Sequence, residues 1–258
     1  MGKLRTGLII ILVLLVFSFC TASSGTVDMQ MYLSSPSVLH PFGCDSLGRD
    51  LLGRTSYALI VSFSVSFLSS ALGVILALVS VWVIRNVPFV GSFLYSLTKA
   101  VRTVPAVILA LFLLSFPGNG TFKLVFTLAL SSACSMTIMI VPLMSSLEGE
   151  EYIIAERSLG LREGRIFMRH IVPSLMNVIR EEFSATLISS VITESSLSFL
   201  GLGLDSSVPT LGRLLSEGRS TALTYPHTVV FPSSALFVLG LGILLVSRAL
   251  SELDAPSE

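Results

Sequence analysis

Long apolar runs with almost no charged side chain are the feature that most restricts how this chain can fold. Hydrophobic residues make up 52% of its 258 residues, charged residues only 12%, and the mean hydropathy is +0.86. Ordinary globular domains carry roughly 25% charged residues, whereas a helix needs about 20 mostly apolar residues to cross a bilayer core. The composition therefore predicts an all-α integral membrane protein in contact with lipid.

Six segments are candidates for transmembrane helices. The third is short unless it extends backwards across Lys99 and Arg102, and it ends at a turn over residues 117–120. The fifth contains one carboxylate, that of Glu194. We expect six spans, which cover residues 7–22, 57–84, 103–116, 124–147, 183–204 and 228–247.

The second span is rich in small residues, which let helices approach closely inside a membrane bundle. We interpret them as packing residues rather than as contacts to a substrate. They are Ser62, Ser64, Ser66, Ser69, Ser70 and Gly73.

The distribution of lysine and arginine predicts the orientation, because cytoplasmic loops retain an excess of positive charge. With the amino terminus inside, eleven of these residues fall on the cytoplasmic side and five on the other. Both termini and the polar segment 148–182 are therefore expected in the cytoplasm. A signal peptide or lipoprotein leader is the alternative for the first span, since Lys3 and Arg5 precede a short apolar stretch and Cys20. Phe19 before this cysteine favours an uncleaved helix, because lipoprotein processing requires a small residue there.

Residues 148–182 form the main polar interruption and hold twelve of the thirty-two charged side chains. Residues 152–158 and 163–171 both favour helix, with Gly160 as the break between them and Pro173 closing the second helix. The segment is therefore predicted to be a helical, water-exposed loop.

Two features of this loop suit docking to a soluble partner. Arg162, Arg165 and Arg169 have the spacing of one helical face. Small Ala155 and Gly160 leave room for another surface to approach. From the residues alone, the loop is either a solvated connection or a docking element for a soluble partner.

Glu194 is the only carboxylate well inside a predicted span. A charge in lipid is costly, so such a residue normally faces a bundle interior or a watery cavity. It either lines or gates a pathway, or lies hydrated near the outer interface, or bonds Ser195 and Ser196.

The segment 23–56 between the first two spans ends in HPFGCDSLGRDLLGR. Gly43 breaks the chain, and Asp45 or Ser46 can cap a helix whose first turn carries Asp50. This pattern predicts a loop followed by a capped helix that leads into the second span.

Several chemistries are not indicated by the sequence. There is no G-x-x-x-x-G-K-[ST] motif, so we expect no ATP hydrolysis by this chain and no enzyme activity. No basic run suggests nucleic acid. The cysteines and histidines have no metal-site spacing; they are Cys20, Cys44, Cys134, His40, His170 and His227.

Three motifs in order resemble one family. EYIIAERSLGLREGRIFMRHIVPS is similar to the cytoplasmic "EAA" loop of permease subunits of binding-protein-dependent ABC importers, in the dipeptide, oligopeptide and nickel branch. HPFGCDSLGRDLLGR resembles the branch's HxxGTDxLGRDxxSR, and ESSLSFLGLGL resembles EAGLSFLGLGV. Together they bracket residues 40–254.

The resemblance implies the type I ABC importer permease fold and a set of site residues. Five residues belong to the loop that couples to an ATPase subunit: Ala155, Glu156, Gly160, Ile171 and Pro173. The three arginines named above lie in the same loop. Glu194 matches the acidic residue before the third motif. The motif before the second span supplies Gly43, Asp45, Gly48, Arg49 and Asp50.

The chain also departs from the family pattern at four positions. Ile154 stands where the first glutamate of the "EAA" motif is usual, and Glu156 where its second alanine is usual. Cys44 replaces a threonine, and Lys99 lies where an acidic residue is common. We expect docking to survive these changes.

By this resemblance, residues 1–56 hold the first helix and an external segment, and residues 57–251 the ABC type-1 permease domain. The chain is expected to be the "C"-type permease of an inner-membrane importer, forming half of a pathway for short peptides, with nickel or a metal chelate as the alternative cargo. Implied partners are a second permease chain, two cytoplasmic ATPase subunits that hold ATP and Mg, and an external solute-binding protein. Two other classes of protein are alternatives. One is a self-sufficient secondary transporter or channel, which predicts inverted repeats with broken helices. The other is a membrane scaffold that anchors a soluble enzyme.

Overall fold

The computed structural model describes residues 2–23, 25–115, 120–205 and 207–254, and most of them are in helices. Within this part the only β pairing is an isolated bridge between Cys44 and Asp50. The helices are α1 (Gly2–Thr21), η1 (Met29–Met31), α2 (Leu51–Asn86), α3 (Pro88–Thr103), α4 (Ala106–Leu114), α5 (Gly120–Glu148), α6 (Glu151–Ser158), α7 (Glu163–Ile166), η2 (Phe167–Ile171), α8 (Val172–Ser174), α9 (Met176–Phe199), α10 (Leu211–Gly218) and α11 (His227–Asp254).

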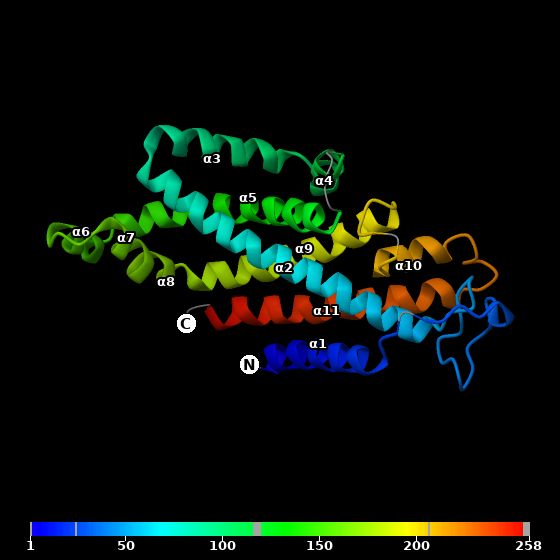
Figure 1. Cartoon of the computed structure of the whole chain (residues 1–258). Coiled ribbons are helices and arrows are strands. Elements are labelled where there is room, and N and C mark those ends of the chain that lie inside the picture. The colour runs from blue at the N-terminus through cyan, green and yellow to red at the C-terminus, as the bar shows by residue number, and fades with distance from the viewer. Residues whose placement is uncertain (1, 24, 116–119, 206, 255–258) are drawn as a thin grey trace.

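The long helices form an elongated bundle, shown in Figure 1. Helix α2 packs against α5 and α9, and α1 packs against α11. The short helices α6 to α8 lie at one end, where α1 begins and α11 ends, and residues 25–50 with α10 lie at the other end. This is the grouping that the charge distribution predicts for two termini and a polar loop on one side of a membrane. That this side is the cytoplasm stays a prediction.

Four helices in the described part are long and apolar enough to cross a membrane: α1, α2, α5 and α11. The pair α3 and α4 meets the same test together and is bent by 104°. Helix α9, which contains the predicted fifth span, runs along the bundle but falls outside this group. Its inward face is rich in serine and threonine and contains Glu194, so its apolar character is lower. The count of six spans remains a prediction.

The predicted third span, 103–116, is not one straight helix. Helix α3 ends at Thr103 and α4 starts at Ala106, with Val104 in an extended conformation between them. Pro105 explains the break, because a proline disfavours helical backbone at the residue before it and has no N–H to donate. Residue 116 and most of the predicted turn, 117–119, lie outside the described residues.

Small residues on α2 bring it close to α5, as predicted. Ser62, Ser66, Ser69 and Ser70 are fully buried, whereas Ser64 is exposed in this chain, so for Ser64 the packing interpretation stays a prediction. At Gly73 a Cβ atom would lie 2.6 Å from Cβ of Ser132 on α5 and 3.1 Å from the Ala129 carbonyl oxygen. The two helices therefore touch through a glycine that no larger residue can replace without a shift.

We predict that Gly73→Ala destabilises the protein by about 1–3 kcal/mol, the usual cost of overpacking a core. Gly240→Ala on α11 is the matched control, because nothing lies within 4 Å of the added atom and alanine favours a helix over glycine. Thermal unfolding in detergent measures both. An equal melting temperature for the two variants would contradict the close α2–α5 contact.

Candidate functional site

The segment between α5 and α9 projects beyond the end of the bundle and folds back on itself (Figure 1). Gly160, between α6 and α7, has φ +81°, a left-handed conformation that suits glycine. A Cβ at this position would meet nothing within 4 Å. The predicted break at Gly160 is thus confirmed, and the turn faces open space. We call residues 149–175 the α6–α8 segment.

Apolar side chains anchor the α6–α8 segment to the bundle. Ile153, Ile166, Phe167 and Ile171 are buried in one cluster with residues of α2 and α5. The site residue Ile171 is therefore an anchor rather than a contact for a partner. Pro173 does not close the second predicted helix, because it lies at the start of α8 and the helical path continues through Leu175 into α9.

The outer surface of this segment carries unpaired cations beside apolar side chains. Ala155 is exposed, as are the three predicted arginines, and within the described part of the chain none of the three is ion-paired to a carboxylate: Arg162, Arg165 and Arg169. Their single helical face is not preserved, because Arg162 precedes α7 and Arg169 lies in the π-helical turn η2. Exposed apolar neighbours are Tyr152, Ile154, Leu159 and Met168. This mixed surface suits docking to another protein.

A buried arginine ties the α6–α8 segment to α2. The side chain of Arg85, only 5% exposed, donates to the carboxylates of Glu148 at the end of α5 and Glu163 in α7. Arg157 of α6 donates to the same Glu163 at 2.8 Å. The partners of Arg85 lie far from it along the chain, so no local pattern in the sequence indicates this network.

The pKa of Glu163 is lowered, first by its hydrogen bond from Arg157 and also by the Arg85 charge. A carboxyl group whose pKa falls on folding stabilises the fold above its unfolded-state pKa. That contribution is lost as the pH falls through the lowered value. The network is therefore intact at neutral pH.

Glu156, one of the departures from the family pattern, has an internal partner. Its Oε1 lies 3.0 Å from Nε2 of His170, which joins α6 to η2. Its other oxygen is buried and accepts no hydrogen bond within the described residues. Glu156 thus braces the two halves of the segment against each other.

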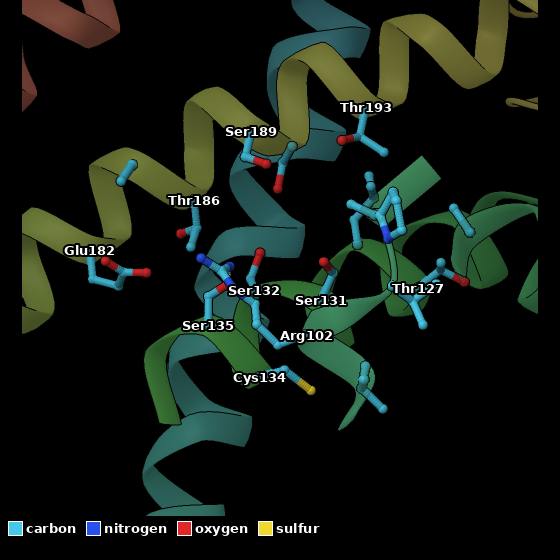
Figure 2. Close-up of a pocket in the computed structure, with 18 residues that line it drawn as sticks. Arg102, Thr127, Ser131, Ser132, Cys134, Ser135, Glu182, Thr186, Ser189 and Thr193 are labelled. Carbon is cyan, nitrogen blue, oxygen red and sulfur yellow. Dashed lines mark hydrogen bonds between the residues drawn. The ribbon is translucent and has the colours of Figure 1, made fainter. Parts of the chain in front are cut away.

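A polar cavity of about 390 Å³ lies between the α3–α4 break, α5 and α9, as Figure 2 shows. Hydroxyl groups supply most of its polar lining; they come from Thr127, Ser131, Ser132, Ser135, Thr186, Ser189, Ser190 and Thr193. The charged residues in its lining are Arg102 and Glu182, and Cys134 also lines it. The sequence did not predict this cavity, because the predicted third span, 103–116, continues through the proline break that opens it.

Glu194 does not line this cavity. It is fully buried and accepts hydrogen bonds from Ser198 at 2.7 Å and Ser195 at 3.4 Å. The hydroxyls of Ser62 on α2 and of Thr210 lie near the carboxylate. Thr210 caps the start of α10, so the carboxylate sits where α9, α2 and α10 meet.

Among the predicted alternatives for Glu194, bonding to nearby serines is confirmed in part. Ser196, the other expected partner, instead donates to the Ile192 carbonyl at 2.7 Å. Helix α10 is pressed against α9 here, since a Cβ on Gly212 would lie 1.9 Å from the Ser195 carbonyl oxygen. A role for Glu194 in a gate stays a prediction.

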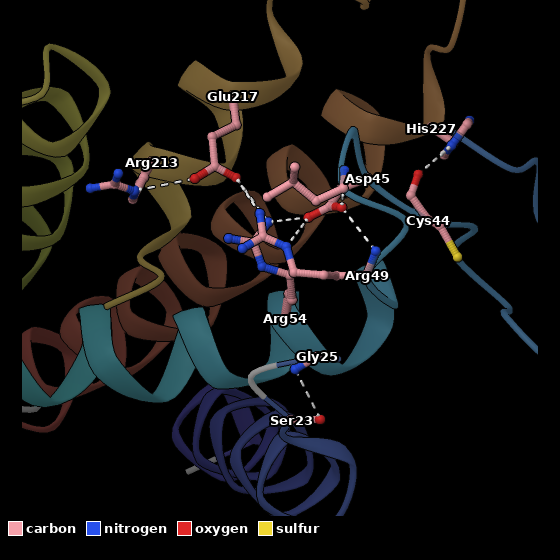
Figure 3. Close-up of polar contacts among 10 residues, drawn as sticks. Ser23, Gly25, Cys44, Asp45, Arg49, Arg54, Arg213, Glu217 and His227 are labelled. Carbon is pink, nitrogen blue, oxygen red and sulfur yellow. Dashed lines mark hydrogen bonds and ion pairs between the residues drawn. The ribbon is translucent and has the colours of Figure 1, made fainter. Parts of the chain in front are cut away.

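At the opposite end of the bundle, the residues of the motif before α2 form one ion-paired cluster (Figure 3). Asp45 accepts from Arg49 at 2.8 Å and from the buried Arg54. Arg54 also donates to Glu217 of α10 at 2.8 Å, and Glu217 accepts from Arg213 at 3.2 Å. Arg54 and Glu217 were not expected to belong to this site.

Backbone constraints account for the rest of this motif. Gly43 and Gly48 have φ of +75° and +69°, and a Cβ on Gly48 would lie 1.6 Å from the Asp28 carbonyl oxygen. The helix cap is Asp50, which accepts from the Gly53 N–H at 2.7 Å, rather than Asp45 or Ser46 as predicted. The motif thus fixes residues 25–50 to α2 and α10.

No group of three or more His, Cys, Asp or Glu side chains in the described part of the chain is arranged to hold a metal ion. The histidines have other partners: His40 lies 2.9 Å from Asp50, and His227 Nε2 lies 3.3 Å from the Cys44 carbonyl oxygen. The candidate functional features of the described residues are therefore the surface of the α6–α8 segment and the polar cavity, rather than a metal site.

Known sequences similar to this chain are membrane components of transport systems. A family model described as "Binding-protein-dependent transport system inner membrane component" matches residues 69–253. The chain is 29% identical over 233 residues to the glutathione transport system permease protein GsiD of Pectobacterium atrosepticum, covering 87% of this chain and 75% of the relative. It is 24% identical over 251 residues to the oligopeptide transport system permease protein OppC of Bacillus subtilis, covering 95% and 82%.

Solved structures share the fold. A chain of the inward-facing MetNI methionine ABC transporter aligns with a TM-score of 0.57 at 16% identity, over 75% of this chain and 94% of that one. A chain of an amino acid ABC transporter, in a crystal structure with histidines, aligns with a TM-score of 0.58 at 17% identity, over 78% and 92%.

We predict that Arg85→Gln loosens the α6–α8 segment, because Glu148 and Glu163 then lose their shared partner. Trypsin, which cleaves after arginine, should cut between residues 157 and 169 several-fold faster than in the unaltered chain. Arg180→Gln is the control, since Arg180 is exposed and makes no ion pair with another described residue. Equal cleavage rates in the two variants would show that Arg85 does not hold the segment.

Proposed function

Because the chain belongs to the family of binding-protein-dependent transport system inner membrane components, we propose that it is a permease subunit of an ATP-driven ABC importer for short peptides. The observation that supports this most directly is the α6–α8 segment, which is anchored by Arg85 and presents unpaired arginines at one end of the bundle. The polar cavity supplies a path for a hydrophilic cargo. The proposed arrangement is six spans of the type I importer fold, with both termini in the cytoplasm.

The α6–α8 segment is proposed to dock into a groove of a cytoplasmic ATPase subunit. Its outer surface combines cations with exposed apolar side chains, a composition that protein interfaces favour. The family residues Ala155 and Gly160 lie at this surface, whereas Glu156 braces it from within. ATP would be held by the partner subunits, and its binding would act here by favouring one of two states of the bundle.

The cavity is proposed to be this chain's half of the translocation pathway. A second permease chain would supply the other half, and an external solute-binding protein would deliver cargo at the end that carries residues 25–50. The bend of 104° between α3 and α4 opens the bundle at the cavity. Hydroxyl groups can hydrogen-bond a passing peptide without a permanent charge.

Short peptides are the cargo that we favour. The relatives GsiD and OppC are named for glutathione and oligopeptide transport, and glutathione is itself a small peptide. For nickel or a metal chelate, the described residues that line the cavity include neither histidine nor aspartate, and those of metal-ligand type are Cys134 and Glu182 alone. We therefore place metal cargo second.

Glu194 is proposed to act in the gate by holding α10 against α9 and α2. Its carboxylate accepts hydrogen bonds from Ser195 and Ser198 of α9, and the hydroxyls of Ser62 on α2 and of Thr210 at the start of α10 lie near it. Separation of α10 would leave a buried carboxyl group with fewer polar neighbours, which is costly in a membrane. The junction therefore favours one closed arrangement over others.

The test of this function is uptake of radiolabelled trialanine into proteoliposomes that contain the complex, the binding protein and internal ATP. Gly160→Leu should lower uptake at least about tenfold with membrane insertion unchanged, because left-handed backbone costs a branched residue roughly 1–2 kcal/mol and the side chain enters the docking surface. Gly160→Asn tolerates that backbone better and should lose less. Uptake without ATPase subunits would instead indicate a self-sufficient transporter, and normal uptake in both variants would remove the turn from the docking surface.

In the same assay, Glu194→Gln should reduce uptake several-fold, since the amide accepts fewer hydrogen bonds from the surrounding hydroxyls. Glu181→Gln is the control, because Glu181 is exposed on the same helix and its recorded contact is with Ser251. Unchanged uptake for Glu194→Gln would return this residue to a purely structural role.

A further inference from the structure

The cavity contains two opposite charges among its eighteen lining residues, Arg102 at the end of α3 and Glu182 on α9. Figure 2 shows both charged groups turned toward the space between α5 and α9. Arg102 is exposed and Glu182 is half-buried, so a ligand in the cavity can reach both side chains.

Most N–H donors of the Arg102 guanidinium group are available to a ligand. One of its nitrogens, Nη1, donates to the hydroxyl of Ser135 on α5. This contact holds the side chain against the cavity wall. A guanidinium has five N–H donors, and no ion pair joins Arg102 to a carboxylate among the residues that the structure describes. The remaining donors suit a planar carboxylate, which arginine binds in two-pronged fashion.

Glu182 offers the complementary charge. It is half-buried, and in the described part of the chain it forms no ion pair with Arg102 or with another cation. Its carboxylate can accept hydrogen bonds from an ammonium group. Two opposite charges therefore line one cavity without forming an ion pair with each other.

The neighbouring wall is suited to the middle of such a ligand. Thr186, Ser132 and Ser135 lie around the two charges in Figure 2, and hydroxyls both donate and accept. The volume of about 390 Å³ is at the small end of the range of roughly 300–1,000 Å³ for ligand pockets. The cavity therefore fits a small molecule with peptide groups.

We propose that Arg102 and Glu182 form a binding site for a zwitterion, in which Arg102 binds the terminal carboxylate of a short peptide and Glu182 binds its terminal ammonium group. This inference rests on the proposed function, and it adds that the cavity recognises its cargo by the charged groups at both ends of the peptide. The alternative is that Arg102 only braces α5 through Ser135.

The test measures ligand-dependent thermal unfolding of the purified complex with its partner subunits and without the binding protein. A ligand that binds only the folded state raises the melting temperature with its concentration. The probes are trialanine, trialanine amide and N-acetyl-trialanine. The variants are Arg102→Gln and Glu182→Gln, with Lys99→Gln and Glu181→Gln as controls, because neither Lys99 nor Glu181 lines the cavity.

We expect trialanine to stabilise the unaltered complex and to bind at least about tenfold more weakly when either terminus is blocked, since each blocked end loses a charge-assisted hydrogen bond. Arg102→Gln should weaken trialanine by a similar factor but leave trialanine amide within about twofold. Glu182→Gln should do the same with N-acetyl-trialanine. The control variants should behave like the unaltered chain.

Two results would overturn the proposal. One is equal stabilisation of the unaltered complex by all three peptides, or by none, which requires no variant to fold. The other is an equal loss of both trialanine and its amide in Arg102→Gln, which would indicate a bracing role only. ATP-driven uptake of trialanine by the unaltered complex, with either result, would show that the proposed function holds and that this site alone fails.

Discussion

Helix α2 is fixed at both ends by a buried arginine, and much of the arrangement depends on these two side chains. Arg54 at its start, with a side chain 4% exposed, pairs with Asp45 and Glu217. Arg85 near its end pairs with Glu148 and Glu163. An arginine in this setting is tolerated because each guanidinium can satisfy two carboxylates at once.

Helix α2 is long enough to link the two ends of the bundle through these anchors. Its 36 residues extend about 54 Å at 1.5 Å per residue, well beyond a hydrocarbon core of about 30 Å. The helix therefore connects the α6–α8 segment directly to α10 at the other end of the bundle. Between the anchors it touches α5 through Gly73 and lies beside Glu194 through Ser62. One continuous helix thus links the two ends of the bundle.

The sequence predicted what depends on local composition and failed where distant residues meet. Apolar runs identified the membrane class and the body of α2, and Gly160 marked its turn because a left-handed position favours glycine. Pro105 broke the third span, and Pro173 did not end its helix, since a proline in a first helical turn costs nothing. Arg54 and Glu217 are separated by 163 positions, so no local pattern could pair them. The cavity that Arg102 lines exists only after α3, α5 and α9 assemble, so no local pattern could indicate it.

The central claim is that the α6–α8 segment is held ready to receive an ATPase subunit. Affinity purification of the chain from its native membrane in mild detergent, followed by mass spectrometry, tests this most directly. The account predicts that ATPase subunits and a second permease chain are recovered with it. Recovery of this chain alone, under conditions that preserve other membrane complexes, would contradict the claim and favour a transporter that works without an ATPase partner.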